Sequence, residues 1–285
     1  MSKIIITCDS TVDLSKELIE KLDVKVIPMT VNMEGKEYKD GVTITPNDIY
    51  RSVDRTGELP RTAAINISEY IQFFEAIRED EDDIILNFTI SSKLSSTFQS
   101  SYNAVGLLEN VYTIDSYNLS TGIALLVMEA CKLRDEGKDI QTIIQTIEEL
   151  KLKVDASFMI DDLKYLAKGG RCSAMARYGA NILAIKPCID VQDGAMGVGK
   201  KYRGKFLKVL KNYISEKLEN VDDLVTDHIF ITHAGVDQEA IDLVYNDLKE
   251  RNIFKNIYIT QAGATISCHC GKNTLGILFV RKSNK

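Results

Sequence analysis

The feature that most constrains the fold is the alternation of short apolar runs with helical patterns over the first 155 residues. Residues 84–90 give the clearest example, because this largely apolar run is typical of a buried parallel strand. A pattern of helical spacing follows over residues 98–108. Strands and helices that alternate through short connections favour a parallel sheet covered by helices. We therefore predict an N-terminal three-layer α/β domain.

The pattern changes near residue 155. Asp193 and Gly194 join two β-rich runs, residues 189–191 and 197–202, into a predicted hairpin. A hairpin within a succession of strands and helices implies a mixed sheet. We expect an α/β protein of two domains, residues 1–155 and 156–285, the second with a mixed sheet and helices. Its other expected strands are residues 156–160, 228–232, 257–260 and 275–280, and its expected helices are residues 163–167, 175–185, 206–214 and 240–248.

Three segments give weaker structural signals. Residues 24–33 are β-rich, but Pro28 has no N–H group for a ladder, so we expect an edge strand or a bulged strand. Residues 59–67 resemble a connection that carries Thr62. Residues 263–271 form a run of small residues around His269, before the last strand.

Hydroxyl side chains follow three of the predicted strands. In open parallel sheets, ligands bind at the carboxyl ends of the strands. The N–H groups at the start of a helix lack internal partners and bind anions, although small hydroxyls there are also common caps. Capping alone does not require all three strand ends to look alike, so we favour an anion site. The residues are Asp9, Ser10 and Thr11; Ser91, Ser92, Ser95 and Ser96; and Asp115, Ser116, Ser120 and Thr121.

Charge and hydropathy argue against several classes of partner. Lys and Arg number 35 against 41 Asp and Glu, a formal charge of −6, which gives no basic footprint for nucleic acid. No apolar run reaches the roughly 18 residues that a membrane span needs. Met1 is followed almost directly by a predicted strand, with no signal peptide. We expect a cytoplasmic protein.

The six cysteines have no framework spacing, so we expect reduced thiols. Cys268, His269 and Cys270 resemble a metal cluster, but paired cysteine ligands normally stand further apart and further ligands are missing. We predict no metal and no cofactor.

Two features bear on whether the chain is an enzyme. The turn at Gly169 and Gly170 lacks the Gly-Lys-Ser/Thr ending of a phosphate loop, and no Gly-x-Ser-x-Gly elbow is present. Arg171 beside this turn could present its guanidinium to a carboxylate or phosphate. The alternative hypothesis is a stand-alone phosphotransferase or hydrolase that uses His269 with the turn at residues 91–96, and the missing loop and elbow speak against it.

Taken in order along nearly the whole chain, several motifs resemble the DegV family. They are residues 9–14 (DSTVDL), Pro28, Thr62, residues 91–97 (SSKLSST), Asp115 with Ser116, residues 168–173 (KGGRCS), Lys186 with Pro187, and His269 with Gly271.

The resemblance implies a non-catalytic lipid-binding protein. Members of the family hold one long-chain fatty acid, with the acyl chain in an apolar tunnel and the carboxylate at the domain junction. Where a fatty acid kinase exists, they present the acid to an ATP-dependent kinase subunit for phospholipid synthesis. By position, Thr62 and Ser95 would bind the carboxylate, with His269 close by. Arg171 and Arg203 would contact the head group or the partner.

The chain departs from the family pattern at two places. Thr62 is followed by Ala63 and Ala64, where the family usually has Thr-Ser-Gln-Pro. Lys272 stands where the family commonly has a glycine-rich turn after the histidine. Neither change removes the residues expected to bind the carboxylate.

Overall fold

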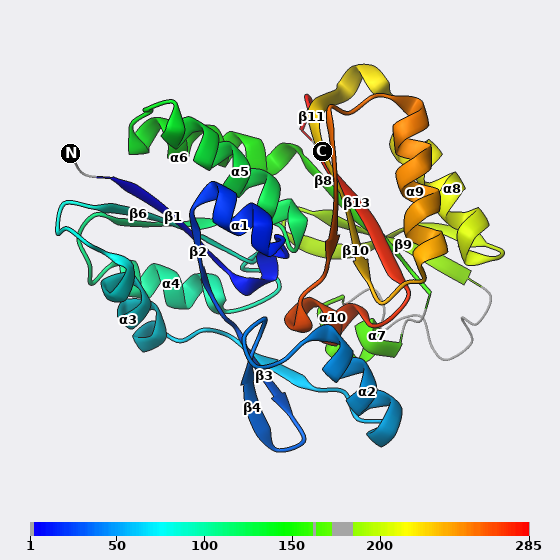
Figure 1. Ribbon diagram of the computed structural model, residues 1–285, viewed down its shortest axis with the longest axis horizontal. Helices are drawn as coiled ribbons and strands as arrows, with labels where there is room; N and C mark the ends of the chain where they lie inside the picture. Colours follow the sequence, from blue (N-terminus) through cyan, green and yellow to red (C-terminus); the bar gives the residue numbers. More distant parts are fainter. Residues whose placement is uncertain (1–2, 162–163, 173–184, 285) are drawn as a thin grey trace.

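Residues 3–161, 164–172 and 185–284 are described by a computed structural model. Within them, the strands form a four-stranded sheet, a six-stranded sheet and a three-stranded sheet (Figure 1).

The four-stranded sheet is parallel and lies in the N-terminal half. Its order is β2-β1-β6-β7, from β1 (Ile4–Asp9), β2 (Val24–Ile27), β6 (Ile84–Thr89) and β7 (Val111–Asp115). Helices cover both faces, which confirms the predicted three-layer arrangement (Figure 1). On one face lie α3 (Ile67–Ile77) and α4 (Thr97–Val105); on the other lie α1 (Lys16–Leu22), α5 (Thr121–Asp135) and α6 (Ile140–Leu150).

The six-stranded sheet is mixed, as predicted. Its order is β10-β9-β8-β13-β11-β12, and the β11/β12 pair is parallel while the other pairs are antiparallel. Asp193 and Gly194 have φ angles of 48° and 79°, the left-handed conformations that a tight hairpin turn requires. The strands are β8 (Val154–Ile160), β9 (Ile185–Gln192), β10 (Ala195–Arg203), β11 (Leu224–Ala234), β12 (Asn256–Gln261) and β13 (Thr274–Arg281). The helices α8 (Phe206–Lys217) and α9 (Gln238–Arg251) pack on one face.

Helix α5 lies between the two larger sheets. Eleven of its fifteen residues are buried, and the remaining four are charged residues near its C-terminal end. One hydrophobic core joins it to the parallel sheet through Ile6 and Phe88 and to the six-stranded sheet through Phe158 and Leu278. The two halves of the chain therefore share a core along α5.

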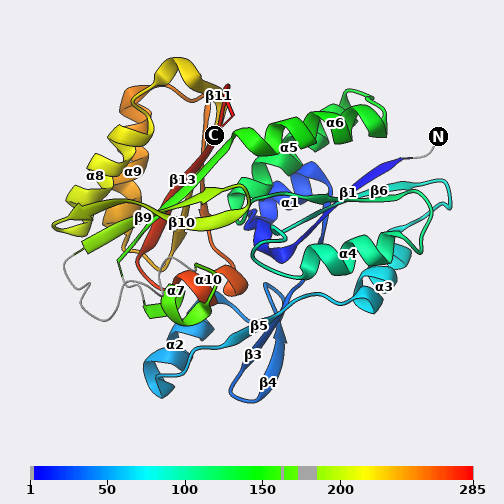
Figure 2. The ribbon, with the colours of Figure 1, turned by 180° about the vertical axis from the view of Figure 1, so that it is seen from behind.

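A three-stranded sheet projects from the N-terminal half. It contains β3 (Thr30–Met33) between β4 (Lys36–Lys39) and β5 (Arg61–Ala63). Figure 2 shows α10 (Ala264–Cys270) and α7 (Lys164–Gly169) beside α2 (Pro46–Thr56), which connects β4 to β5. Val31, Ile49 and Tyr50 form a core with Ala264 and Cys268 of α10. Single 3-10 turns lie at Ser10–Val12, Lys151–Lys153 and Val221–Asp223.

Several local predictions need correction. Residues 24–33 form two strands in different sheets, on either side of Pro28. The first, β2, is an edge strand, as expected, whereas β3 is the central strand of the three-stranded sheet. The connection at residues 59–67 contains β5, and the small-residue run before β13 is mostly the helix α10. Most of the helix expected at residues 175–185 lies outside the described residues, but Ile185 and Pro187 belong to strand β9.

The chain passes from α6 to β8 at residues 151–153, near the boundary expected at residue 155. The exact division into domains at that boundary stays a prediction. No helix in the described part of the chain is long and apolar enough to cross a bilayer.

Candidate functional site

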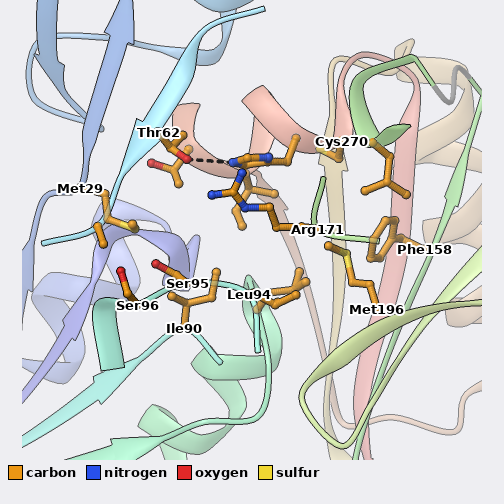
Figure 3. A pocket seen from close by; sticks show the side chains of 16 residues that line it. Met29, Thr62, Ile90, Leu94, Ser95, Ser96, Phe158, Arg171, Met196 and Cys270 are labelled. Atoms are coloured by element: carbon orange, nitrogen blue, oxygen red, sulfur yellow. Dashed lines mark hydrogen bonds between the residues drawn. The ribbon is translucent and has the colours of Figure 1, made fainter. Parts of the chain in front are cut away.

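A cavity of about 290 Å³ lies between the strand ends of the parallel sheet and the inner face of the six-stranded sheet. Distant parts of the chain meet around it: the loop after β6, strand β5, helix α10 and the hairpin strand β10 (Figure 3). Ten of its sixteen lining residues are apolar: Met29, Ala64, Ile90, Leu94, Leu119, Phe158, Leu166, Met196, Ile266 and Cys270.

A second, smaller cavity of about 40 Å³ adjoins the first. Leu119, Phe158, Ile266 and Cys270 line both cavities. The lining of the smaller cavity continues along β11 and β13, where it is also mostly apolar. Together the two cavities offer an apolar path that leads away from the polar end of the larger one.

The polar end of the larger cavity is built around Thr62 and His269. Thr62 lies on β5, and its Oγ1 is 2.9 Å from Nε2 of His269 on α10 (Figure 3). Burial, together with the positive charge of Arg171, lowers the pKa of His269 to about 4. The imidazole is therefore neutral at pH 7. If Nε2 carries the proton, it donates to Thr62, whose own hydroxyl proton is then free to point at a ligand.

Arg171 brings positive charge to this end of the cavity. Its side chain is exposed and donates from Nη1 to the carbonyl oxygen of Gly169 at 2.8 Å. With His269 neutral, no other described residue lining the cavity is charged. No described carboxylate lies within ion-pair distance of Arg171. Figure 3 shows its guanidinium extending toward Thr62 and Ser95. The end of the cavity can therefore accept an anion.

The hydroxyls of the loop after β6 have different surroundings. Ser95 Oγ is 2.8 Å from Thr97 Oγ1, accepts from the Thr97 N–H, and remains partly exposed to the cavity. Ser96 is exposed and also lines the cavity. Ser91 is buried and accepts from the N–H of Lys93, so it stabilises the turn. Ser95 and Ser96 are thus the members of this group that a ligand could contact.

Buried carboxylates at the other strand ends support the site from behind. Asp9 accepts from the N–H groups of Thr11 and Ile90 at 3.0 and 2.8 Å, and Asp115 accepts from the N–H of Ser92 at 3.1 Å. Burial raises the pKa of Asp9. These aspartates hold loops in place and are not among the residues lining the cavity.

Two further aspartates fix the start of α10. Asp13 accepts from the N–H of Gly263 at 2.7 Å. Asp40 accepts from the N–H groups of Ala264 and Thr265 at 2.7 and 3.0 Å. These bonds satisfy N–H groups that have no partner inside the helix. They set the position of α10 and hence of His269.

The structure gathers four of the five residues predicted from the sequence. Thr62, Ser95, Arg171 and His269 line one cavity. Arg203 lies apart from it, exposed at the end of β10 and opposite Ile185 in the hairpin. Sequence reasoning missed Thr265 and Met196. Thr265 stands four residues before His269, a spacing that would have pointed to one helix face had the segment been recognised as a helix.

No group of three or more His, Cys, Asp or Glu side chains in the described residues is arranged to hold a metal ion. All six cysteines are buried thiols, as expected for a reduced chain.

The family model described as "Uncharacterised protein, DegV family COG1307" matches residues 3–282. A DegV domain-containing protein of Clostridium acetobutylicum is 32% identical, over 99% of this chain and 100% of its own. Another DegV domain-containing protein, from Caldanaerobacter subterraneus subsp. tengcongensis, is 30% identical over 99% of this chain and 100% of its own.

Solved structures show the same fold. A DegV family protein from Thermus thermophilus, described by its fatty acid binding, superimposes with a TM-score of 0.90 at 25% identity, over 98% of this chain and 99% of its own. DegV from Bacillus subtilis, described as a fatty acid binding protein, superimposes with a TM-score of 0.87 at 26% identity. The match covers 99% of this chain and 100% of that protein. A stearic acid-binding protein from Eubacterium ventriosum gives 0.82 at 27% identity over 99% of each chain.

Proposed function

The chain belongs to the DegV family, and on that premise we propose that it binds one long-chain fatty acid between its two halves. The carboxylate is bound by Thr62 and Ser95 beside His269, and the acyl chain occupies the apolar cavities. The observation that carries this proposal is a largely apolar cavity whose polar end holds hydroxyls and one cation, Arg171. Relatives described as fatty acid binding proteins share this fold over their full length.

The two parts of the ligand would contribute differently to binding. Burying about 14 methylenes at about 0.8 kcal/mol each is worth on the order of 11 kcal/mol before the costs of association. A hydrogen bond to a charged group nets about 1.5–3 kcal/mol. The acyl chain therefore supplies most of the affinity. The hydroxyls fix which end of the ligand lies at the cavity mouth.

The polar contacts suit a carboxylate. The Nε2–H tautomer of His269 leaves the Thr62 hydroxyl free to donate to the acid, and Ser95 can donate from the facing loop. Arg171 offsets the negative charge while remaining in contact with water. An anion held at this place stays reachable from outside.

We further propose that an ATP-dependent kinase subunit phosphorylates the bound acid, which places the chain in the cytoplasm with its ATP. The exposed side chain of Arg171 at the mouth supports a role in contacting the phosphorylated head group. Arg203, exposed and outside the cavity lining, fits a contact with the partner better than one with the acid.

A stand-alone phosphotransferase or hydrolase is less well supported. A serine nucleophile needs a base within hydrogen-bond reach. In the described residues, His269 Nε2 bonds to Thr62, while the Ser95 hydroxyl bonds to Thr97. ATP turnover by the purified chain without a partner would reverse this preference.

Native mass spectrometry of protein purified from a bacterial host tests the proposal. We expect one acyl chain per monomer. Thr62→Ala with Ser95→Ala should retain less acid, with near-native circular dichroism, because the carboxylate loses two donors. Protein that is repeatedly empty and takes up neither oleate nor palmitate would exclude fatty acid binding.

A further inference from the structure

Two buried polar atoms of residues lining the cavity have no hydrogen-bond partner in the described part of the chain, Oγ1 of Thr265 and Nδ1 of His269. Thr265 is 3% exposed. Three other hydroxyls at or near the cavity are bonded: Thr62 to His269, Ser95 to Thr97, and Ser267 to the carbonyl oxygen of Ala262. Ser96, which also lines the cavity, is exposed.

A buried hydroxyl without a partner destabilises the folded state, so a protein keeps one at a cost. Such groups are uncommon in native structures, and a ligand is one explanation for them. An apolar residue of the same shape, valine, would fill the site without this penalty. The position of Thr265 is therefore suboptimal for the empty protein.

The backbone around Thr265 is held firmly. Its N–H donates to Asp40 Oδ2 at 3.0 Å, and the preceding N–H of Ala264 donates to Asp40 Oδ1 at 2.7 Å. Asp40 is itself buried and also accepts from the Ser10 hydroxyl. The backbone that carries the Thr265 side chain is thus fixed before a ligand binds, which reduces the entropy that binding would cost.

Thr265 lies on the same face of α10 as His269. Residues four apart on a helix are neighbours on one face, with a rise of about 6 Å between them. Both side chains line the cavity, and His269 is bonded to Thr62 at its polar end. Thr265 therefore lies one helical turn before His269 on the cavity side of α10.

We infer that Thr265 is a further ligand of the bound acid, donating its hydroxyl proton to the carboxylate. This inference rests on the proposed function. An alkyl chain offers no acceptor, whereas a carboxylate accepts at two oxygens with about four lone-pair positions. The carboxylate can accept from Thr62, Ser95 and Arg171 and still has a lone pair for one more donor.

Thr265→Val tests the inference, because it removes the hydroxyl and nearly preserves the volume. We expect the affinity of delipidated protein for palmitate to fall about ten- to a hundredfold, about 1.4 kcal/mol for each factor of ten. Affinity for palmitate methyl ester, which lacks the charge, should change by less than about threefold. Thr265→Ser keeps the hydroxyl and should retain most of the affinity for palmitate.

A second measurement separates a binding role from a structural one. The lipid-free Thr265→Val protein should melt at the same temperature as the wild type or higher, because an unpaired buried hydroxyl is removed. Lower affinity together with unchanged or higher thermal stability is the signature of a ligand contact. A lipid-free melting temperature more than about 3 °C below that of the wild type would overturn the inference.

The remaining outcomes are distinct. If wild-type protein binds palmitate and Thr265→Val binds it equally well, only the role of Thr265 is wrong. The same conclusion follows if the variant loses equal affinity for the acid and its methyl ester, because cavity shape would then be responsible. If the wild type binds no palmitate, the proposed function fails as well.

Discussion

At the scale of single residues, the site depends on keeping His269 uncharged. Burial and Arg171 lower its pKa to about 4, below the ordinary value of 6.5. The neutral ring can bond to Thr62 without adding charge to an apolar cavity. The charge at the mouth then belongs to Arg171, where water can reach it.

This lowered pKa makes stability depend on pH. The unfolded chain binds a proton at His269 below about pH 6.5, whereas the folded chain binds it only near pH 4. The contribution of the neutral His269 to the free energy of unfolding is therefore fully present above pH 6.5 and is lost as the pH falls toward 4. Between pH 7 and pH 5, the free energy of unfolding should fall by about 2 kcal/mol more in the wild type than in His269→Gln.

Urea unfolding at the two pH values measures this difference. His228 and His233, whose pKa values burial also lowers, are present in both proteins, so their contributions cancel. Equal pH dependence in wild type and variant would contradict a buried neutral His269.

At the scale of elements, α10 connects the two halves of the chain at the site. Its first N–H groups bond to Asp13 and Asp40 of the N-terminal half, and Ala264 packs against the core of the three-stranded sheet. Its last residues lead into β13 of the six-stranded sheet. The position of His269 thus depends on contacts more than 200 residues away in sequence.

Asp40→Asn should disturb both stability and binding. The amide keeps one acceptor oxygen but turns an NH₂ group toward backbone donors, so about 2–3 kcal/mol of unfolding free energy should be lost. Retention of fatty acid should fall with it, because α10 shifts. The matched control is Asp54→Asn, which breaks an exposed ion pair with Lys272 and should cost less than about 1 kcal/mol. Equal losses in both variants, measured by urea unfolding, would show that Asp40 does not anchor α10.

Local patterns predicted the long elements and missed the short ones. The strand and helix at residues 84–105, the α5 and α6 pair and the β9–β10 hairpin each carry their own periodicity or turn residues. Strand β5 has three residues and forms only by pairing with β3, about 30 residues earlier. Helix α10 has seven residues, and distant aspartates hold its start. Such elements are determined by tertiary contacts, which no local window contains.

The same limit applies to the site. The serine-rich turn could be recognised as a place for an anion from its own residues. The pairing of Thr62 with His269 joins positions 207 residues apart, so only the family resemblance suggested it. Thr265 was missed because no secondary structure was assigned to its run of small residues, which the structure shows to be mostly helix.

At the scale of the whole molecule, the proposed ligand lies where the two halves meet, and a partner would approach from outside. Arg203→Ala should leave palmitate affinity within about twofold of the wild type, because Arg203 does not line the cavity. Acyl phosphate formation with an ATP-dependent fatty acid kinase from the same cell should fall at least several-fold, since a rim charge mainly affects association. A tenfold loss of palmitate affinity would instead make Arg203 a ligand of the acid.

The place of β13 has a consequence for biosynthesis. This strand lies between β8 and β11, yet it is later in the chain than both. On the ribosome, the N-terminal parallel sheet can form early, while the edges of β8 and β11 stay unpaired until residues 274–281 emerge. The wall of the smaller cavity, to which Thr274, Gly276 and Leu278 contribute, is therefore incomplete until β13 has paired with both neighbours. If the chain binds a fatty acid as proposed, a nascent chain without β13 lacks part of the apolar wall that would hold the acyl group.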